Sequence, residues 1–425
     1  MTDTTRILLR NGHVIDTEPE PVAHPGTDVL IEDGRIAAVG RDLPAEGATV
    51  IDATDRIVLP GFVDTHRHVW QSALRSAAVD MDLMGYLGVM GQLGARLRPQ
   101  DIHTATLVGA LESLDSGVTT LMDFSHALNT PEHADAAVDG LQAAGLRAVF
   151  GYGFPPGAPA NYDDVRRIRA GRLDDDEALV TMALAPMGPS FTPPEVVAGD
   201  WGLAADLGLP VTFHVSAGPV AAQPVSVLRE LGLLDVKALY VHGNSLDDDE
   251  LKLIADSGGH ASVTPSTEAM LSIGQPVTGR YRRAGVTTSL GADAVTSAPG
   301  DMFSVMRAAL VASQVTDDAA ERLSVRDVLR MATLDGAVAL GLADRIGSLR
   351  PGKQADVILL RLDDLNLLGA ERDPIAAVVT AAHPQNVDTV LVAGQVVKSA
   401  GRLVNGDLPE AAQALRDTAS AVSAG

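Results

Sequence analysis

The sequence contains no cysteine, and this absence excludes several kinds of chemistry at once. Without a thiol the chain can form no disulfide, offers no thiolate nucleophile and supplies no thiolate ligand to a metal. A tightly held metal ion would therefore depend on histidine and carboxylate side chains. The chain has 11 histidines and 55 acidic residues, so such ligands are plentiful.

Basic residues are scarce as well. The chain has 32 Lys and Arg, and its formal net charge is −23. Nucleic acids and anionic membranes are bound by clustered Lys and Arg, so we expect neither as a partner. There is no run of about 18 apolar residues for a membrane span, and residues 1–12 lack the apolar region of a signal peptide. We expect a cytoplasmic homo-oligomer, a dimer or tetramer, that acts on a small molecule.

Both ends of the chain are rich in short strand-like segments. Residues 6–10, 28–32 and 35–39 near the start, and 355–361 and 389–392 near the end, have this character, and Glu-Asp-Gly-Arg at 32–35 is a hairpin signal. We expect the two ends to meet in one small β-sandwich domain, made of residues 1–58 and 347–425 and carrying a C-terminal helix. Residues 59–346 would form the second domain.

The middle of the chain alternates apolar strands with helical stretches, which implies a parallel sheet. Eight such units over this length fit a closed (β/α)8 TIM barrel, whose active site lies at the carboxyl ends of the strands. The predicted fold class is therefore α/β, a barrel with a β-sandwich domain. The eight expected strands are 57–66, 119–124, 147–153, 180–187, 211–216, 238–244, 260–266 and 287–294.

Histidines and one aspartate stand at the ends of these strands. His66 and His68 lie two residues apart, so they share one face of the first strand. His214, His242 and Asp293 end the fifth, sixth and eighth strands. A single histidine at a strand end is more often structural, but five such residues at one rim predict a metal site.

Three segments then resemble the amidohydrolase superfamily, and the resemblance covers essentially the whole chain. Residues 58–68, VLPGFVDTHRH, resemble its strand-1 motif, residues 290–294, LGADA, its strand-8 motif, and residues 346–357 its return to the β-domain. The sequence HRHVWQSALR at 66–75 is most similar to the branch of cytosine deaminases, S-adenosylhomocysteine deaminases and chlorohydrolases.

The resemblance implies that His66, His68, His214 and Asp293 bind one divalent transition metal, with His242 beside the metal-bound water. Imidazoles with a carboxylate suit Zn²⁺, with Fe²⁺ as the alternative. Such a metal activates water and polarises the electrophile, Asp293 could accept the water proton, and His242 could donate to the developing oxyanion. Relatives with two metals often bridge them through a carboxylated lysine on strand 4. Residues 180–188 contain no lysine, so we expect one metal.

One position departs from the pattern. In deaminases of this branch the strand-5 histidine usually opens an HxxE motif whose glutamate shuttles protons, but here the segment is HVSA and the position holds Ala217. Glu268, just after strand 7, is a possible substitute as a catalytic residue, and its alternative is an exposed loop carboxylate. Trp70 could equally be ordinary packing. The expected substrate contacts are Trp70, Gln71, Tyr86, His126 and Tyr152.

Three functions remain open from the sequence. The leading one is hydrolysis at a carbon bearing an amine or another leaving group, on a purine, pyrimidine, triazine-like or amide substrate, by a deaminase-like amidohydrolase acting on non-peptide C–N bonds. The second is hydrolysis of a C–S, C–halogen or thioester-like bond, which needs less acid assistance and is favoured by the missing glutamate. The third is a non-catalytic barrel that binds other proteins, which the full set of retained metal ligands disfavours.

Overall fold

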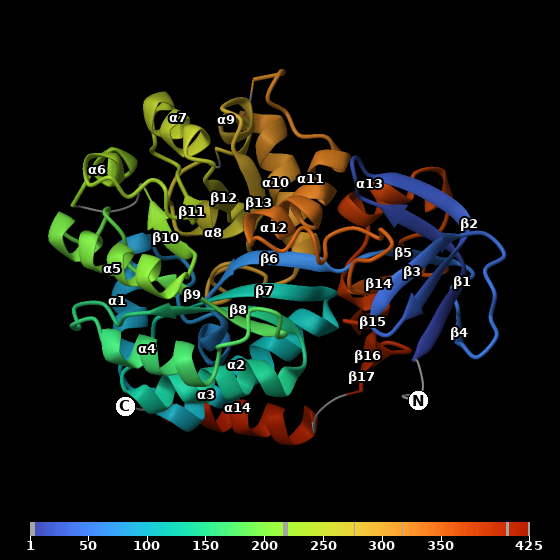
Figure 1. Cartoon of the computed structure of the whole chain (residues 1–425), viewed down its shortest axis with the longest axis horizontal. Coiled ribbons are helices and arrows are strands. Elements are labelled where there is room, and N and C mark those ends of the chain that lie inside the picture. Colours follow the sequence, from blue (N-terminus) through green and yellow to red (C-terminus); the bar gives the residue numbers. More distant parts are fainter. Residues whose placement is uncertain (1–4, 216–219, 276, 317, 405–407, 424–425) are drawn as a thin grey trace.

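The computed structural model of the chain describes residues 5–215, 220–275, 277–316, 318–404 and 408–423. Figure 1 shows two regions side by side, a barrel surrounded by helices and a smaller sheet. The smaller sheet is built from strands at the two ends of the chain. The predicted fold class, a (β/α)8 barrel with a β-domain built from both ends of the chain, is confirmed. None of the described helices combines the length and apolar character that crossing a bilayer requires.

The β-domain is one continuous, mostly antiparallel sheet. The expected hairpin joins β2 to β3, where Asp33 and Gly34 both have the positive φ of a tight two-residue turn, 48° and 77°. The strands are β1 (Arg6–Asp16), β2 (Val22–Glu32), β3 (Arg35–Gly40), β4 (Thr49–Asp52), β5 (Arg56–Pro60), β14 (Val357–Arg361), β15 (Val387–Val392), β16 (Gln395–Ser399) and β17 (Arg402–Leu403).

The two ends of the chain meet where β14 pairs antiparallel with β5. Side chains of these strands alternate between two cores, as expected from the two faces of a strand. Val58 packs with Val357 and Leu359 in a core inside the β-domain. Ile57 and Leu59 face the other way and join the main core of the molecule. The β-domain is thus fixed to the barrel through buried apolar side chains.

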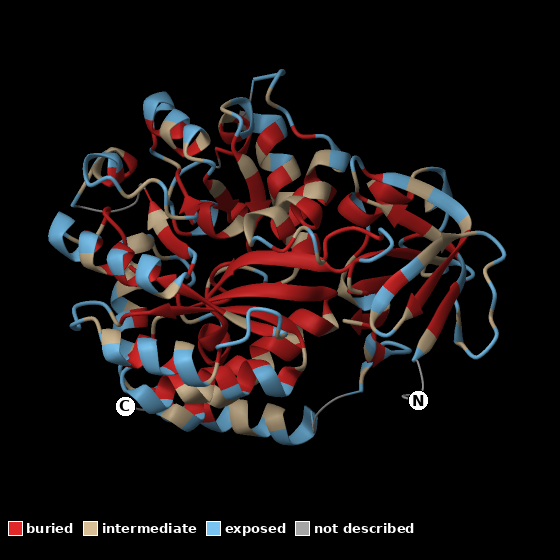
Figure 2. Cartoon of the chain, in the orientation of Figure 1, coloured by how far each residue is buried: buried red, intermediate tan, exposed pale blue. Residues whose placement is uncertain are grey.

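The barrel consists of eight parallel strands in sequence order, β6 to β13. A parallel bridge between Arg67 and Asp293 links the last strand end to the first. Figure 2 shows the strands almost entirely buried and the surrounding helices exposed on their outer faces. The strands are β6 (Phe62–Arg67), β7 (Val118–Ser125), β8 (Arg147–Gly153), β9 (Val180–Ala185), β10 (Val211–Val215), β11 (Ala238–His242), β12 (His260–Val263) and β13 (Thr287–Leu290).

The first expected strand, 57–66, is wrong as a single element. It is divided at Gly61 into β5 of the β-domain and β6 of the barrel. Gly61 donates its N–H to the carbonyl of Asp356, 3.0 Å away, and a Cβ at this position would lie only 2.1 Å from Oγ1 of Thr119. Only glycine allows this close approach of the backbone, where the chain passes from one sheet to the other.

Helices cover the outside of the barrel, and many begin with proline, whose missing N–H costs nothing in a first turn. They are α1 (Leu83–Gly94), α2 (Pro99–Asp115), α3 (Pro131–Ala144), α4 (Tyr162–Gly171), α5 (Pro194–Leu207), α6 (Pro224–Glu230), α7 (Asp248–Asp256), α8 (Pro265–Met270), α9 (Thr278–Arg283), α10 (Met302–Thr316), α11 (Val325–Met331), α12 (Leu334–Ala339), α13 (Pro374–Thr380) and α14 (Leu408–Ser423), with 3-10 helices η1 (Val69–Leu74), η2 (Ala370–Arg372) and η3 (Pro384–Asn386).

The C-terminal helix lies elsewhere than expected. The sequence assigns it to the β-domain, but α14 runs beneath the barrel helices in Figure 1 and packs against α2. Thr418 donates a hydrogen bond to Asp101 of α2 at 3.1 Å, and Arg96 donates to the carbonyl of Val422 at 3.0 Å. These contacts attach the end of the chain to the barrel.

Candidate metal centre and active site

The ends of the barrel strands bring three of the predicted ligands into one buried group. His66 lies in β6, His68 directly follows this strand, and Asp293 follows β13. The Nε2 atoms of His66 and His68 each lie 3.3 Å from Oδ1 of Asp293. His214, at the end of β10, places its Nε2 atom 3.3 Å from that of His66. His66, His214 and His242 form a second group that overlaps the first.

These distances test whether the residues fit a metal ion. Zinc bonds to imidazole and carboxylate measure about 2.0–2.2 Å, so two ligand atoms of a tetrahedral site lie about 3.3–3.5 Å apart. The three contacts at 3.3 Å have this spacing. His68 donates from Nδ1 to the carbonyl of Phe124 at 3.0 Å, which leaves its Nε2 lone pair toward the group. The donor set and its spacing therefore fit a divalent transition metal.

Electrostatics keep these donors in the state that binds metal. Burial lowers the pKa of His66 to about 4 and the pKa of His214 well below its usual range, so both imidazoles are neutral at pH 7. Burial alone would raise the pKa of Asp293, but its hydrogen bonds with His66 and His68 hold that pKa well below its usual range. A carboxylate thus faces neutral imidazoles.

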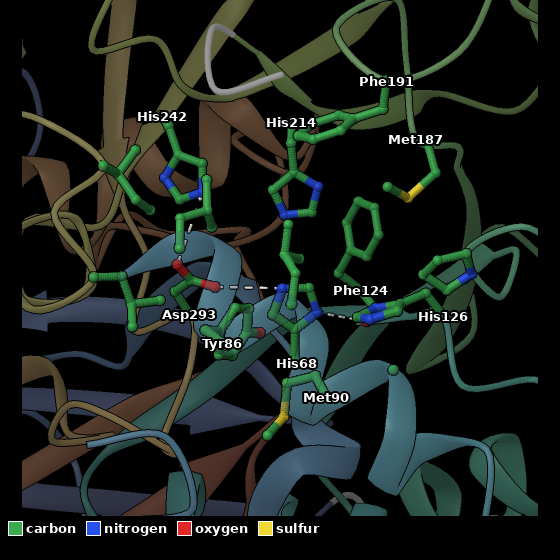
Figure 3. A pocket seen from close by; sticks show the side chains of 16 residues that line it. His68, Tyr86, Met90, Phe124, His126, Met187, Phe191, His214, His242 and Asp293 are labelled. Atoms are coloured by element: carbon green, nitrogen blue, oxygen red, sulfur yellow. Dashed lines mark hydrogen bonds and ion pairs between the residues drawn. The ribbon is translucent and has the colours of Figure 1, made fainter. Parts of the chain in front are cut away.

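The second oxygen of Asp293 faces His242. Oδ2 accepts a hydrogen bond from Oγ1 of Thr264 at 3.2 Å and lies 3.8 Å from Nε2 of His242. Asp293 and His242 both have positive φ, 61° and 71°, a conformation that is uncommon for residues other than glycine. The backbone turns sharply at both strand ends and aims the two side chains at each other (Figure 3).

Glu268 approaches His242 from the opposite side. It lies in α8, which begins directly after β12, and is fully buried, so its alternative as an exposed loop carboxylate is wrong. Oε1 of Glu268 lies 3.3 Å from Nδ1 of His242 and accepts from the backbone N–H of Thr264 at 2.9 Å, while Oε2 accepts from Nδ2 of Asn244 at 3.1 Å. Burial lowers the pKa of His242, but the hydrogen bond with Glu268 and the charge of Asp293 more than offset this and raise it.

A cavity opens in front of the predicted metal ligands (Figure 3). Glu268 is not among its lining residues, but His242, which Glu268 contacts, is. The lining residues of the described chain are His68, Leu83, Tyr86, Leu87, Met90, Gly91, Phe124, His126, Pro156, Met187, Phe191, His214, His242, Leu271, Ile273 and Asp293.

Two of the five expected substrate contacts, Tyr86 and His126, lie on this lining and three do not. Trp70 is buried behind His126, with the ring centroids 5.2 Å apart and the planes nearly perpendicular. Gln71 donates from Nε2 to the hydroxyl of Tyr86 at 2.7 Å and so supports the wall from behind. Tyr152 donates to Asp164 at 2.8 Å and lines a separate surface pocket.

Several lining residues were missed from the sequence. Leu83, Leu87 and Met90 belong to α1, a helix inserted between β6 and α2, and Met187 and Phe191 follow β9. Their apolar side chains carry no chemical signature of a site. The only available signal was their position in long segments after strand ends, where barrel enzymes build their pockets. Ala217 lies outside the described residues.

A (β/α)8 barrel that gathers imidazoles and a carboxylate at its mouth defines the class of metal-dependent barrel hydrolases. A model of the Amidohydrolase family matches residues 57–397. The chain therefore belongs to the amidohydrolase family, and the predicted metal-dependent hydrolase of deaminase-like kind is confirmed at this level.

Individual proteins support the same grouping. A 5-methylthioadenosine/S-adenosylhomocysteine deaminase from Moorella thermoacetica is 32% identical, over 95% of this chain and 97% of its own. The structure of an adenosine deaminase from Xanthomonas campestris with bound zinc superposes with a TM-score of 0.89 at 26% identity and covers 99% of each chain. That of the zinc-bound atrazine chlorohydrolase from Arthrobacter aurescens gives 0.86 at 24% identity over 98% of this chain and all of the other, and shares the fold.

Proposed function

We propose that the protein hydrolyses a C–N bond at an amine-bearing carbon of a heteroaromatic ring or an amide, and releases ammonia or an amine. The observation that carries this proposal is the convergence of His66, His68, His214 and Asp293 at the barrel mouth, with His242 facing Asp293 across 3.8 Å. The relatives named as deaminases support the choice of a C–N bond.

In this proposal His66, His68, His214 and Asp293 hold one cation, Zn²⁺, with Fe²⁺ as the alternative. Zinc bound to the adenosine deaminase of the same fold favours Zn²⁺. When bound, the cation supplies Lewis-acid chemistry, which lowers the pKa of water and polarises the electrophile.

The chain's own residues then handle the protons. Oδ2 of Asp293 is held by Thr264 at 3.2 Å and has His242 as its neighbour, so it can accept a proton from an attacking water. His242 donates from Nε2 to the oxyanion or to the departing nitrogen. Because Nδ1 of His242 faces Glu268, the carboxylate fixes the orientation of the imidazole and favours its protonated form.

Glu268 is therefore proposed as a positioning residue. The sequence pointed to it as a possible substitute for the glutamate whose position Ala217 holds, because a carboxyl after strand 7 could reach the same pocket. Its burial and its bonds to His242, Thr264 and Asn244 instead support action through His242. His242 would then deliver the proton that the usual glutamate delivers in relatives.

A second candidate is hydrolysis of a C–S, C–halogen or thioester-like bond. Ala217 favours it, because a leaving group that departs as a stable anion needs less acid assistance. The substrate panel described below separates C–N hydrolysis from thioester hydrolysis through the product released, which is ammonia or an amine in the first case and a thiol in the second.

The test begins with protein purified without chelator. We expect about one zinc or iron per chain, and hydrolysis of at least one member of a panel of aminopurines, aminopyrimidines, aminotriazines and thioesters. His214→Asn should lose metal and activity together, whereas His260→Asn, at the opposite end of the barrel strands, should retain both. Full metal content without hydrolysis of any panel member would contradict the proposal and favour a binding protein.

We also propose a cytoplasmic homo-oligomer. Leu365 and Leu368 are 90% and 61% exposed, and Val311 and Val315 on α10 are 62% and 79% exposed. A contiguous patch of exposed apolar side chains is typical of a surface that a second copy covers. Light scattering of the purified protein should give the mass of a dimer or tetramer, and a monomer would contradict this.

A further inference from the structure

The wall of the cavity away from the metal ligands is almost entirely apolar. Leu87 and Met90 come from α1, Met187 and Phe191 from the segment after β9, and Leu271 and Ile273 from the segment after α8. Figure 3 shows Met187, Phe191 and Phe124 together on the side away from Asp293 and His242. This wall therefore faces the part of a substrate that does not react.

Few groups in this wall can form hydrogen bonds. Among the described lining residues outside the metal group, only Tyr86 and His126 have polar side chains, and none is a carboxylate, amide, lysine or arginine. The Tyr86 hydroxyl already accepts a hydrogen bond from Gln71 at 2.7 Å. A sugar in this space would bury several hydroxyls, most of which have no partner among the described side chains, and each unpaired hydroxyl costs binding free energy.

We propose, on the basis of the proposed function, that the substrate is an amino-substituted heteroaromatic ring with a compact apolar substituent, such as an alkyl or alkylthio group, and that nucleosides are rejected. The ring presents its amine-bearing carbon to the metal group. Its substituent lies against Met187, Phe191 and the α1 side chains. In this respect the protein departs from its relatives named as deaminases of nucleosides.

The size of the effect follows from burial. Each methylene moved from water into the apolar wall contributes about 0.8 kcal/mol, which is about fourfold in affinity. An apolar pocket rejects a similar group with an added hydroxyl by about a hundredfold. Affinity should therefore rise with each added methylene in an alkyl series. A hydroxylated compound of equal size should bind much more weakly than its alkyl counterpart.

The experiment uses zinc-loaded enzyme and two probe series. The first is melamine carrying an N-ethyl, N-propyl or N-(2-hydroxyethyl) group, and the second is 9-ethyladenine, 9-propyladenine and adenosine. Calorimetric binding and kcat/KM for amine or ammonia release are measured for each. We expect the propyl compounds to exceed the ethyl compounds about fourfold, and the hydroxyethyl compound and adenosine to fall at least about a hundredfold below their alkyl counterparts.

The outcomes separate the two proposals. Tighter binding of alkyl compounds without turnover of any probe would contradict the proposed function and leave the apolar wall supported. If adenosine or the hydroxyethyl compound is bound and hydrolysed as well as the alkyl compounds, the proposed selectivity of the apolar wall is refuted, while the proposed hydrolytic function stands. Failure of every probe to bind would also overturn it.

A pair of matched variants locates the effect. Met187→Gln keeps the length of the side chain and adds an amide to the wall. It should reduce the preference for the alkyl compounds over the hydroxyethyl compound at least tenfold, and the hydroxyethyl compound itself should bind more tightly. Met270→Gln makes the same change on α8, at a residue that is 46% exposed and outside the lining, and should leave both series unchanged. An unchanged preference in Met187→Gln would overturn the assignment of this wall.

Discussion

Replacing Glu268 by glutamine removes the charge behind His242 without changing the shape of the side chain. The amide oxygen can still accept from His242 and the N–H of Thr264 if its NH₂ group takes the position of Oε2. That position faces Asn244, whose Oδ1 atom is buried without a partner among the described residues and can turn to accept. We therefore expect Glu268→Gln to fold.

The expected loss is that of one hydrogen bond to a charged group, about 1.5–3 kcal/mol. If His242 uses that bond mainly in the transition state, kcat/KM falls about ten- to hundredfold. The variant should also shift the pH dependence of kcat/KM in a defined direction. Burial lowers the pKa of His242, and the hydrogen bond with Glu268 and the charge of Asp293 together more than offset this. Without the charge of Glu268 the pKa of His242 therefore falls. The limb of the pH profile that requires protonated His242 then moves to lower pH.

The assay is kcat/KM from pH 5 to 10 for the parent, Glu268→Gln and the control Glu250→Gln. Glu250 is also a buried glutamate, but it accepts the N–H groups of Val225 and Ser226 at the start of α6, away from the site. Both variants should keep their metal. A Glu268→Gln profile that coincides with the parent, or an equal shift in Glu250→Gln, would refute the role of Glu268 through His242.

Four further changes test other parts of the structure. His66→Asn should lose most of the bound metal, measured by elemental analysis, because its Nε2 atom belongs to both ligand groups. His242→Ala should keep its metal and lower kcat about 10²–10³-fold. Burial raises the pKa of Asp200 to about 6, against a smaller opposing effect of Tyr162, so this carboxylate lowers stability increasingly as pH rises from about 4 to 6. Asp200→Asn should therefore raise the melting temperature at pH 8 but not at pH 3.5. Truncation after Ala343 should give insoluble protein, because it removes β14, the partner of β5, and recovery of soluble, active truncate would refute this.

The barrel could be predicted from the sequence because its strands are buried and separated by helices with clear start signals. Errors arose where the chain changes direction. The expected strand 260–266 ends at Val263, because Pro265 begins α8, and strand 57–66 is broken at Gly61 by a close contact with Thr119. Such contacts join segments far apart in the sequence, and no local pattern reports them. The position of α14 on α2 is of the same kind, since its amphipathic pattern predicts a helix but not its partner.

The convergence of the histidines and Asp293 could be predicted because these residues have distinctive chemistry and stand at strand ends. The direction in which a side chain points was harder. Glu268 follows strand 7 as expected, but one turn of α8 aims its carboxylate at His242 and away from the cavity. Trp70 and Gln71 follow β6 directly, yet η1 directs both behind the wall. The position of a residue within a single helical turn determines whether its side chain points into the cavity. This position cannot be predicted from the sequence pattern.

The proposed proton donor, His242, lines the cavity, whereas the carboxylate that supports it, Glu268, does not. Glu268 carries its carboxylate behind His242, where His242, Thr264 and Asn244 satisfy it. His242 then presents only an imidazole to the substrate. Glu268 and the apolar wall thus form one proposed arrangement, in which the donor is supported from outside the cavity so that the cavity itself can bind an apolar group.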